Sequence, residues 1–215
     1  MERKLEPRDL HLFYSNPILR YLQNWGHLIT ESFLPKSGLI MDLGAGTGEH
    51  QNFSSLNETM VSLDQNFDLL KNGCLINRMN LPIQGTAQKL PFKKNVFDGI
   101  VSVYCFEHLT DLEICISEAS RILKPNGILS LALPTEGFLF KVGRHFVTAP
   151  LAVKNLGFES IKDYENYVKK QHINSLEKII ELVKKWFIIL EMKWFPFFIS
   201  SPSVNFSVAI KAQKF

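Results

Sequence analysis

A glycine-rich segment near the start of the chain has the residue types and spacing of a nucleotide-like cofactor site. The run Asp42-Leu43-Gly44-Ala45-Gly46-Thr47-Gly48 directly follows apolar residues. Glycines at alternate positions allow φ/ψ angles that let a ligand approach the backbone closely. A helix predicted over Thr47–Leu56 would point free N–H groups and its positive dipole end at this turn, which favours a nucleotide-like or carboxylate-bearing cofactor.

A second acidic residue stands at the right distance to complete such a site. Asp64 follows the predicted strand Thr59–Leu63 and lies 22 residues after Asp42. In nucleotide-binding α/β folds, an acid at this point accepts hydrogen bonds from ribose hydroxyls. An ionised carboxylate can accept two such O–H groups at once. The alternative is an aspartate that only caps the next helix.

The spacing of the glycines bears on which cofactor is bound. A dinucleotide fingerprint is G-x-G-x-x-G, but here the pattern is G-x-G-x-G, and Glu49 occupies the place of the third dinucleotide glycine. This departure disfavours a dehydrogenase. Taken alone, the stretch is also compatible with a plain tight turn in an α/β protein.

The elements that must position these residues alternate between strand and helix. Apolar runs predict strands, and spacings of three and four predict helices. This alternation is typical of a parallel sheet with helices on both faces. The predicted strands are residues 39–43, 59–63, a short strand beginning near Leu81, and residues 95–103, 128–133, 187–195 and 204–212.

Residues 1–37 precede the first strand and have helical periodicity. They predict one or two amphipathic helices, broken near Asn16-Pro17. These helices would either pack on the sheet or form a lid over the cofactor pocket from Phe13, Tyr14 and Trp25. The periodic apolar positions include Leu10, Ile18, Leu19, Leu22, Ile29 and Phe33.

Several motifs in order resemble the class I S-adenosylmethionine-dependent methyltransferases, of the small-molecule, methyltransferase-11-like type. They are the D-x-G-x-G-x-G run, the acid after strand two, the loop Gly85–Phe92, the strand Phe97–Ser102 and the turn Arg121–Gly127. The resemblance is strong over residues 38–133 and loose over 174–212. It implies a Rossmann-like, seven-stranded, mostly parallel sheet whose last strand is antiparallel.

The resemblance also implies which residues bind S-adenosylmethionine. The glycines would pass under its methionine part, Asp42 would orient the turn toward its amino group, and Asp64 would hold the ribose. Thr86 stands where an acid usually meets the adenine amine, a loss of about 1 kcal/mol, and Thr86 or Gln88 could partly replace that acid. The predicted cofactor residues are Asp42, Gly44, Ala45, Gly46, Thr47, Gly48, Asp64, Gln65, Thr86, Ala87, Gln88 and Tyr104.

The acceptor side is predicted from the loop after strand four and from an insertion at about 134–173 of a domain spanning 38–215. A hydroxyl acceptor needs a base within hydrogen-bond reach. Glu107, His108 and His145 are the catalytic candidates, with His172 as a further histidine, because imidazole titrates near operating pH. The alternative is that these residues begin a helix or lie on the surface.

The chemistry expected is transfer of a methyl group to an O or N atom of a small-molecule acceptor. Residues after Pro134 and the tail 194–198 loosely resemble bacterial methyltransferases of sugar or surface-polysaccharide synthesis. A sugar or nucleotide-sugar is therefore the first hypothesis for the acceptor. A lipid or quinone acceptor is the second hypothesis. A domain that binds S-adenosylmethionine without performing chemistry is the third.

Composition and charge disfavour several other classes of protein. A net charge of +3 and interleaved lysines and glutamates disfavour a nucleic-acid partner. The charged N-terminus does not read as a signal peptide, and no apolar run reaches the ~18 residues of a membrane span. Three cysteines without C-x-x-C spacing, and histidines that pair with no cysteine, predict a cytoplasmic protein without a metal site. A monomer or homodimer is expected.

Overall fold

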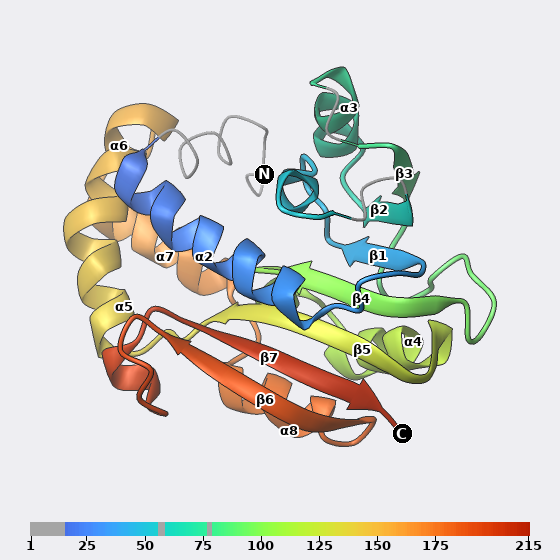
Figure 1. Ribbon diagram of the computed structural model, residues 1–215. Helices are drawn as coiled ribbons and strands as arrows, with labels where there is room; N and C mark the ends of the chain where they lie inside the picture. The colour runs from blue at the N-terminus through green and yellow to red at the C-terminus, as the bar shows by residue number, and fades with distance from the viewer. Residues whose placement is uncertain (1–15, 56–58, 77–78) are drawn as a thin grey trace.

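Seven strands form one twisted sheet in the computed structural model, which describes residues 16–55, 59–76 and 79–215 (Figure 1). Their order across the sheet is β3-β2-β1-β4-β5-β7-β6. β1 to β5 pair in parallel, whereas β7 runs antiparallel to both β5 and β6. The predicted fold class is therefore confirmed. The strands are β1 (Ile40–Leu43), β2 (Met60–Asp64), β3 (Leu81–Gln84), β4 (Phe97–Val103), β5 (Leu123–Pro134), β6 (Phe187–Phe195) and β7 (Ser207–Lys214).

Helices cover both faces of the sheet, because the central strands are apolar on both sides. Successive residues of β1 show this: Ile40 packs in a cluster with Leu34, whereas Met41 belongs to the large opposite core. Helices α4 (Leu112–Ile122) and α8 (Leu176–Val183) pack together on the side of that large core. Burial on both faces is what parallel strands require.

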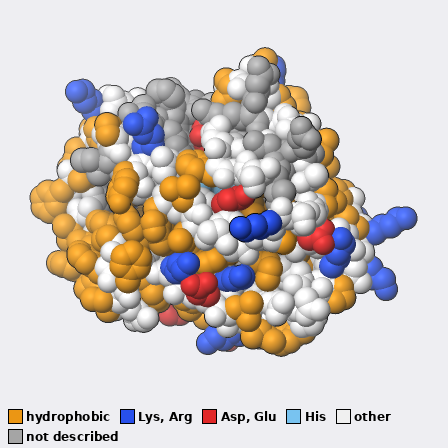
Figure 2. Space-filling view, in the orientation of Figure 1, with side chains coloured by type: hydrophobic (Ala, Val, Ile, Leu, Met, Phe, Trp, Pro, Cys, Tyr) orange, Lys and Arg blue, Asp and Glu red, His pale blue; other side chains and the backbone are white. Residues whose placement is uncertain are grey.

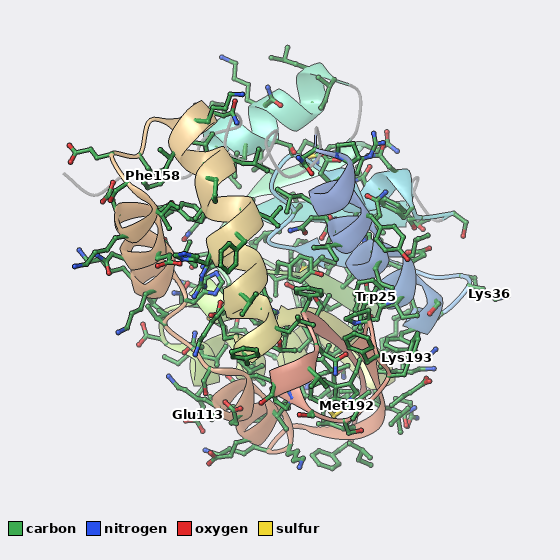
Figure 3. All side chains as sticks on the ribbon, turned by 90° about the vertical axis from the view of Figure 1, so that its left-hand side faces the viewer. Trp25, Lys36, Glu113, Phe158, Met192 and Lys193 are labelled. Carbon is green, nitrogen blue, oxygen red and sulfur yellow. The ribbon has the colours of Figure 1, made fainter. Side chains whose placement is uncertain are left out.

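Helix α2 (Pro17–Phe33) lies across β4, β5 and β7, on the other face of the sheet. The hydroxyl of Ser130 in β5 donates to the carbonyl of Thr30, at 2.8 Å. Trp25 stacks on Phe195 at the end of β6, with ring centroids 4.9 Å apart (Figure 3). The described part of the N-terminal segment is thus a helix packed on the sheet. Phe13 and Tyr14, the other residues of the expected lid, and Leu10 lie outside the described residues.

The segment predicted as an insertion is helical and gathers at the carboxyl end of the parallel strands (Figure 1). It consists of α5 (Phe138–Gly143), the π-helix η4 (Arg144–Thr148), α6 (Ala149–Leu156) and α7 (Ile161–Gln171). A small core of its own joins Ala149 and Ala152 to Tyr164 and Val168. Phe158, in the link between α6 and α7, packs edge-on against Tyr164 (Figure 3).

Three local predictions were wrong. The helix expected over Thr47–Leu56 is only the short 3-10 helix η1 (Glu49–Asn52), because Gly48 before it takes a left-handed conformation and Gln51 turns inward to bond Ser62. The run Thr110-Asp111-Leu112-Glu113 has the T-x-x-E spacing that predicts a capping box at the start of the next helix, but the box does not form. The Thr110 hydroxyl instead accepts from Gln88, and α4 begins after Asp111, which is left-handed and makes no side-chain cap. The turn expected to separate α4 from the next strand, Lys124–Gly127, lies inside β5.

The conformation of Asn126 inside β5 and the start of α3 agree with local sequence chemistry. Asn126 has φ 64°, the left-handed conformation expected of an asparagine in that turn. Helix α3 (Phe67–Leu75) is capped by Asn66, whose side chain accepts from the N–H groups of Asp68 and Leu69. No helix within the described residues is long and apolar enough to cross a bilayer.

Candidate functional site

The glycine turn between β1 and η1 uses a backbone conformation that other residues rarely adopt. Gly44, Gly46 and Gly48 have φ values of 78°, 55° and 78°. The N–H groups of Gly44 and Ala45 both donate to Leu63 O, at 2.8 and 3.0 Å. The turn is thereby fastened to the end of β2.

Cys105, in the loop after β4, packs directly against this turn. A Cβ on Gly44 would overlap the Cys105 Sγ atom, so the first glycine is required both by its φ and by this contact. Burial, together with the nearby Glu107 and Asp64 carboxylates, raises the pKa of the Cys105 thiol. The thiol therefore stays protonated and serves as packing rather than as a nucleophile.

Asp64 is bound to the turn by its own side chain. Its Oδ2 accepts the Gly46 N–H at 2.9 Å, and its Oδ1 accepts the Asn66 N–H at 2.7 Å. Burial raises the pKa of Asp64, and these backbone hydrogen bonds partly oppose the rise. Each carboxylate oxygen keeps a second lone pair, so the group can still accept two hydroxyl donors.

Asp42 lies beneath the turn and is 2% exposed. Among the described residues its Oδ2 has no hydrogen-bond partner. Burial raises the pKa of Asp42 to about 6, with His50 lowering it and Asp64 adding to the rise. A buried carboxylate oxygen without a donor is uncommon in proteins, and it marks a place where a cationic or N–H-bearing group would be held.

The short helix η1 connects the turn to α2 through buried histidines. His50 Nε2 lies 3.2 Å from Glu31 Oε2, and its Nδ1 lies 3.2 Å from His27 Nδ1. Burial, with His50 beside it, lowers the pKa of His27 well below its usual value. α2 is thus tied to the cofactor side of the sheet as well as to β5.

The other predicted cofactor residues differ in their exposure to solvent. Gln65 is exposed just after Asp64, whereas Ala45, Thr47 and Ala87 are buried. Thr86 and Gln88 contact each other, and the Gln88 amide reaches the Thr110 hydroxyl at 2.7 Å.

Tyr104 follows β4, and its side chain lies between β7 and α2. Its hydroxyl lies 3.0 Å from Ser207 Oγ in β7 and 3.5 Å from Leu22 O in α2, so its side chain joins the helix to the sheet.

A second polar cluster stands at the carboxyl end of β4. Glu107 and His108 form the 3-10 helix η3 (Phe106–His108), and His172 follows α7. One potential ligand atom from each of the three lies within 4.8 Å of the others. Glu107 is 3% exposed, and burial raises its pKa to about 7 against the lowering effect of His172. The structure thus unites two of the three predicted catalytic residues with the further histidine.

Two residues behind this cluster orient it. Glu136 follows β5 with a left-handed φ of 52°, and its Oε1 lies 2.6 Å from His172 Nδ1. Arg144 donates to the same carboxylate at 3.0 Å. Desolvation raises the pKa of Glu136, but the hydrogen bond and charge of His172, together with Arg144, outweigh it and hold that pKa below its usual value. His145 is not in this cluster. It pairs instead with Glu165 on α7, at 2.9 Å, and its side chain is 48% exposed.

Asn174 clamps the two sides of the cluster together. Its side-chain amide donates to Phe106 O at 3.1 Å and to Leu109 O at 2.7 Å, and its backbone N–H donates to Glu107 O at 3.1 Å. The segment that carries His172 is thereby fixed on η3.

Sequence reasoning gave no individual role in the site to four residues that the structure places there: Cys105, Glu136, Arg144 and Asn174. Position immediately after β4 or β5 was the signal available for Cys105 and Glu136. Arg144 and Asn174 had no local signal, because their partners are distant in the chain.

The strand order, the antiparallel β7 and the glycine turn define the class I methyltransferase fold. In agreement, residues 41–131 match the family described as "Methyltransferase domain", so the chain is similar to that family over this range. A solved structure from Thermotoga maritima, a SAM-dependent methyltransferase described as a possible histamine N-methyltransferase, has a TM-score of 0.62. It is 20% identical and covers 95% of this chain and 99% of its own.

Two curated relatives bear on the acceptor. The ubiquinone/menaquinone biosynthesis C-methyltransferase UbiE of Vibrio cholerae is 29% identical over 103 residues, which is 42% of this chain and 38% of the relative. The chain therefore spans well under half the length of that relative. The ubiquinone biosynthesis O-methyltransferase of Pelagibacter ubique is 26% identical over 205 residues, covering 87% of this chain and 82% of the relative.

The chemistry of the turn fits S-adenosylmethionine. The unpartnered Asp42 oxygen would meet a positively charged amino group, directly or through water. The lone pairs left on Asp64 would meet a pair of ribose hydroxyls.

Proposed function

We propose that this chain binds S-adenosylmethionine across the glycine turn and transfers its methyl group to a small-molecule acceptor at the carboxyl ends of β4 and β5. The observation that carries the proposal is the left-handed glycine turn bound to Asp64 above the buried, unpartnered oxygen of Asp42. The family match over residues 41–131 supports the same chemistry.

The residues of the chain have separate tasks in this function. Gly44, Gly46 and Gly48 keep the backbone open under the methionine part, Asp42 holds the amino group, and Asp64 holds the ribose. Bound S-adenosylmethionine supplies a methyl group attached to a positively charged sulfur. The leaving group is the neutral thioether that remains after the methyl group is transferred. The protein's contribution is then mainly to align the acceptor, which alone can supply a large rate factor.

The acceptor side is the region bordered by Glu107, His108 and His172. Glu107 is close enough to influence both Cys105 and Tyr104 electrostatically, so the cluster stands next to the cofactor turn. Glu136 and Arg144 close it from the side of β5 and η4. Polar groups of this kind hold an acceptor by its oxygen or nitrogen atom.

The surface beside this region favours an acceptor with an apolar ring. α5 and η4 carry Phe138 and Phe146, each 73% exposed, and the loop after β6 carries Phe197 and Phe198, 56% and 73% exposed. α5 lies against the 3-10 helix η5 (Pro202–Val204), and hydrophobic side chains gather over this side of the molecule (Figure 2). The names of the relatives, which concern quinone synthesis, support a quinone-type acceptor for this chain.

The first test is cofactor binding by isothermal titration, with S-adenosylhomocysteine and with NAD. We expect binding of S-adenosylhomocysteine and none of NAD. Binding of NAD alone would replace this proposal with the dehydrogenase reading.

The second test is transfer of a labelled methyl group from S-adenosylmethionine to two acceptor panels. One panel holds hydroxylated, prenylated ring compounds, and the other holds nucleotide sugars. Label in the first panel supports the quinone-type acceptor, and label in the second would establish the sugar reading instead. Tight cofactor binding without label in either panel or in cell extracts would mean a non-catalytic cofactor-binding domain.

A further inference from the structure

We propose that Glu107, His108 and His172 bind one divalent transition-metal ion at the carboxyl end of β4. These three residues each offer a ligand atom, and the three atoms lie within 4.8 Å of one another. Two imidazoles and one carboxylate form a donor set that suits Zn²⁺, Fe²⁺ or Co²⁺ better than Mg²⁺, which prefers oxygen ligands.

The orientation of both imidazoles supports this site. His172 Nδ1 is 2.6 Å from Glu136 Oε1, and His108 Nδ1 is 3.0 Å from Gln171 O. Both partners are acceptors, so each Nδ1 carries a proton, and in the neutral form of each ring Nε2 is the free nitrogen. Histidines that bind metals usually donate their other N–H to a carboxylate or a backbone carbonyl in this way.

The carboxylate of Glu107 completes the donor set. Its side chain is 3% exposed, and its Oε1 lies 3.8 Å from His108 Nε2. Among the described residues, its Oε2 has no hydrogen-bond partner. A buried carboxylate is normally paired with a cation or bound to a metal, and a metal ion between Glu107 and the imidazoles would meet that need.

The site is held in place by the surrounding contacts, and only side chains need to move. Asn174 ties the segment carrying His172 to η3, and Arg144 fixes Glu136 behind the His172 ring. Ligand atoms on one tetrahedral Zn²⁺ lie about 3.3 Å apart, so the cluster must contract by up to about 1.5 Å. Small rotations of the half-exposed His108 ring and of Glu107 supply that movement.

Three protein ligands leave at least one coordination position for another molecule. Such an open position is typical of catalytic rather than structural zinc sites. If the proposed methyl transfer holds, the ion would bind the acceptor by a hydroxyl oxygen, which points to an O-methylated acceptor. This role rests on the proposed function, whereas metal binding itself does not.

The experiment measures Zn²⁺ and Co²⁺ binding to the full chain after chelator treatment, by competition with a chromophoric chelator and by the visible spectrum of Co²⁺. We expect about one bound ion per chain, and a visible spectrum typical of Co²⁺ with nitrogen ligands. His108→Ala, His172→Ala and Glu107→Gln should each remove it, while thermal unfolding shows that each variant is folded. His145→Ala is the matched control and should bind like the wild type. Glu136→Gln should weaken binding about 10–100-fold.

The proposal is overturned if the folded wild type binds neither ion, or if His172→Ala and His108→Ala bind as tightly as His145→Ala. S-adenosylhomocysteine titration on the same samples separates the two hypotheses. Cofactor binding without metal binding would leave the proposed function standing and remove this site. Metal binding without cofactor binding would support this metal site and contradict the proposed function.

Discussion

The carboxylate of Asp64 accepts a hydrogen bond from the backbone N–H of Gly46, so the acid that ends β2 holds the second glycine of the turn in place. The two residues are 18 positions apart in the chain, yet the contact is 2.9 Å. Any ligand that binds Asp64 therefore also meets a turn whose shape Asp64 helps to fix.

Replacing Asp64 tests this relationship. We expect Asp64→Ala to weaken S-adenosylhomocysteine binding by about 1.5–3 kcal/mol, because charge-assisted hydrogen bonds are lost. The variant should also unfold at a lower temperature, since the Gly46 and Asn66 N–H groups lose their acceptor. Titration calorimetry and thermal unfolding measure the two effects. Asp68→Ala, at an exposed aspartate of α3, is the control, and an unchanged dissociation constant for Asp64→Ala would contradict the assignment.

The buried carboxyl group of Asp42 predicts how the folding stability changes with pH. Its pKa is raised from 3.8 to about 6, so the folded state binds the proton more tightly than the unfolded state. Its contribution to stability is therefore complete below about pH 4 and is lost as the pH rises through about 6. Two pKa units correspond to about 3 kcal/mol.

Urea unfolding of the wild type and of Asp42→Asn at pH 4 to 8 checks this. The stability of the variant relative to the wild type should rise by up to about 3 kcal/mol across that range. Comparing the two proteins at each pH cancels the contributions of groups that titrate identically in both. A difference that stays constant with pH would mean that Asp42 is ionised in the folded protein throughout.

Gly44 and Gly157 form a matched pair for measuring the contact with Cys105. Both have φ 78°, but a Cβ on Gly157 has no neighbour within 4 Å, whereas one on Gly44 would overlap Cys105 Sγ. Gly157→Ala should cost only the left-handed strain, about 1–2 kcal/mol. Gly44→Ala should cost a further 1–3 kcal/mol, roughly, from overpacking.

Chemical denaturation measures the loss of unfolding free energy in both variants. The double variant Gly44→Ala/Cys105→Ala should regain the part of the loss that comes from overpacking, but not the part that comes from the left-handed strain. Equal losses for Gly44→Ala and Gly157→Ala would show that Cys105 moves aside freely.

Asn174 should be important for stability although it is a single polar side chain. Asn174→Ala removes the side-chain amide that donates to the carbonyls of Phe106 and Leu109, and we expect a loss of about 1–3 kcal/mol. Asn155→Ala, which removes an exposed contact within one helix, should change stability by less than about 0.5 kcal/mol. Thermal and urea unfolding of both variants compare the two sites, and similar losses would argue against the clamp.

The cofactor half of the site could be predicted because its signals are local. Alternate glycines after an apolar strand, and an acid at the end of the next strand, meet wherever consecutive parallel strands end at one edge. The topology β1–β2 places Asp42 and Asp64 together without any knowledge of the rest of the chain. The length of the helix after the turn could not be read, since burial of His50 against α2 depends on tertiary packing.

The acceptor half of the site could be predicted only in part from the sequence. Glu107 and His108 could be named because they directly follow β4, but His172 meets them only through the fold of α5 to α7. Those helices have small or aromatic buried faces, such as Ala149 and Tyr164, which give weak periodicity in the sequence. The expectation of no metal site considered histidines beside cysteines, and spacing alone could not join His108 to His172.

The place of β7 has a consequence for how the chain reaches its native state. β6 pairs only with β7 among the described strands, and β7 alone joins it to β5. Until Ser207–Lys214 emerges from the ribosome, the edge of β5 that faces away from β4 therefore has no neighbouring strand, and β6 has no strand to pair with. Nascent chains interrupted before Ser207 should expose that bare edge to chaperones or to other chains.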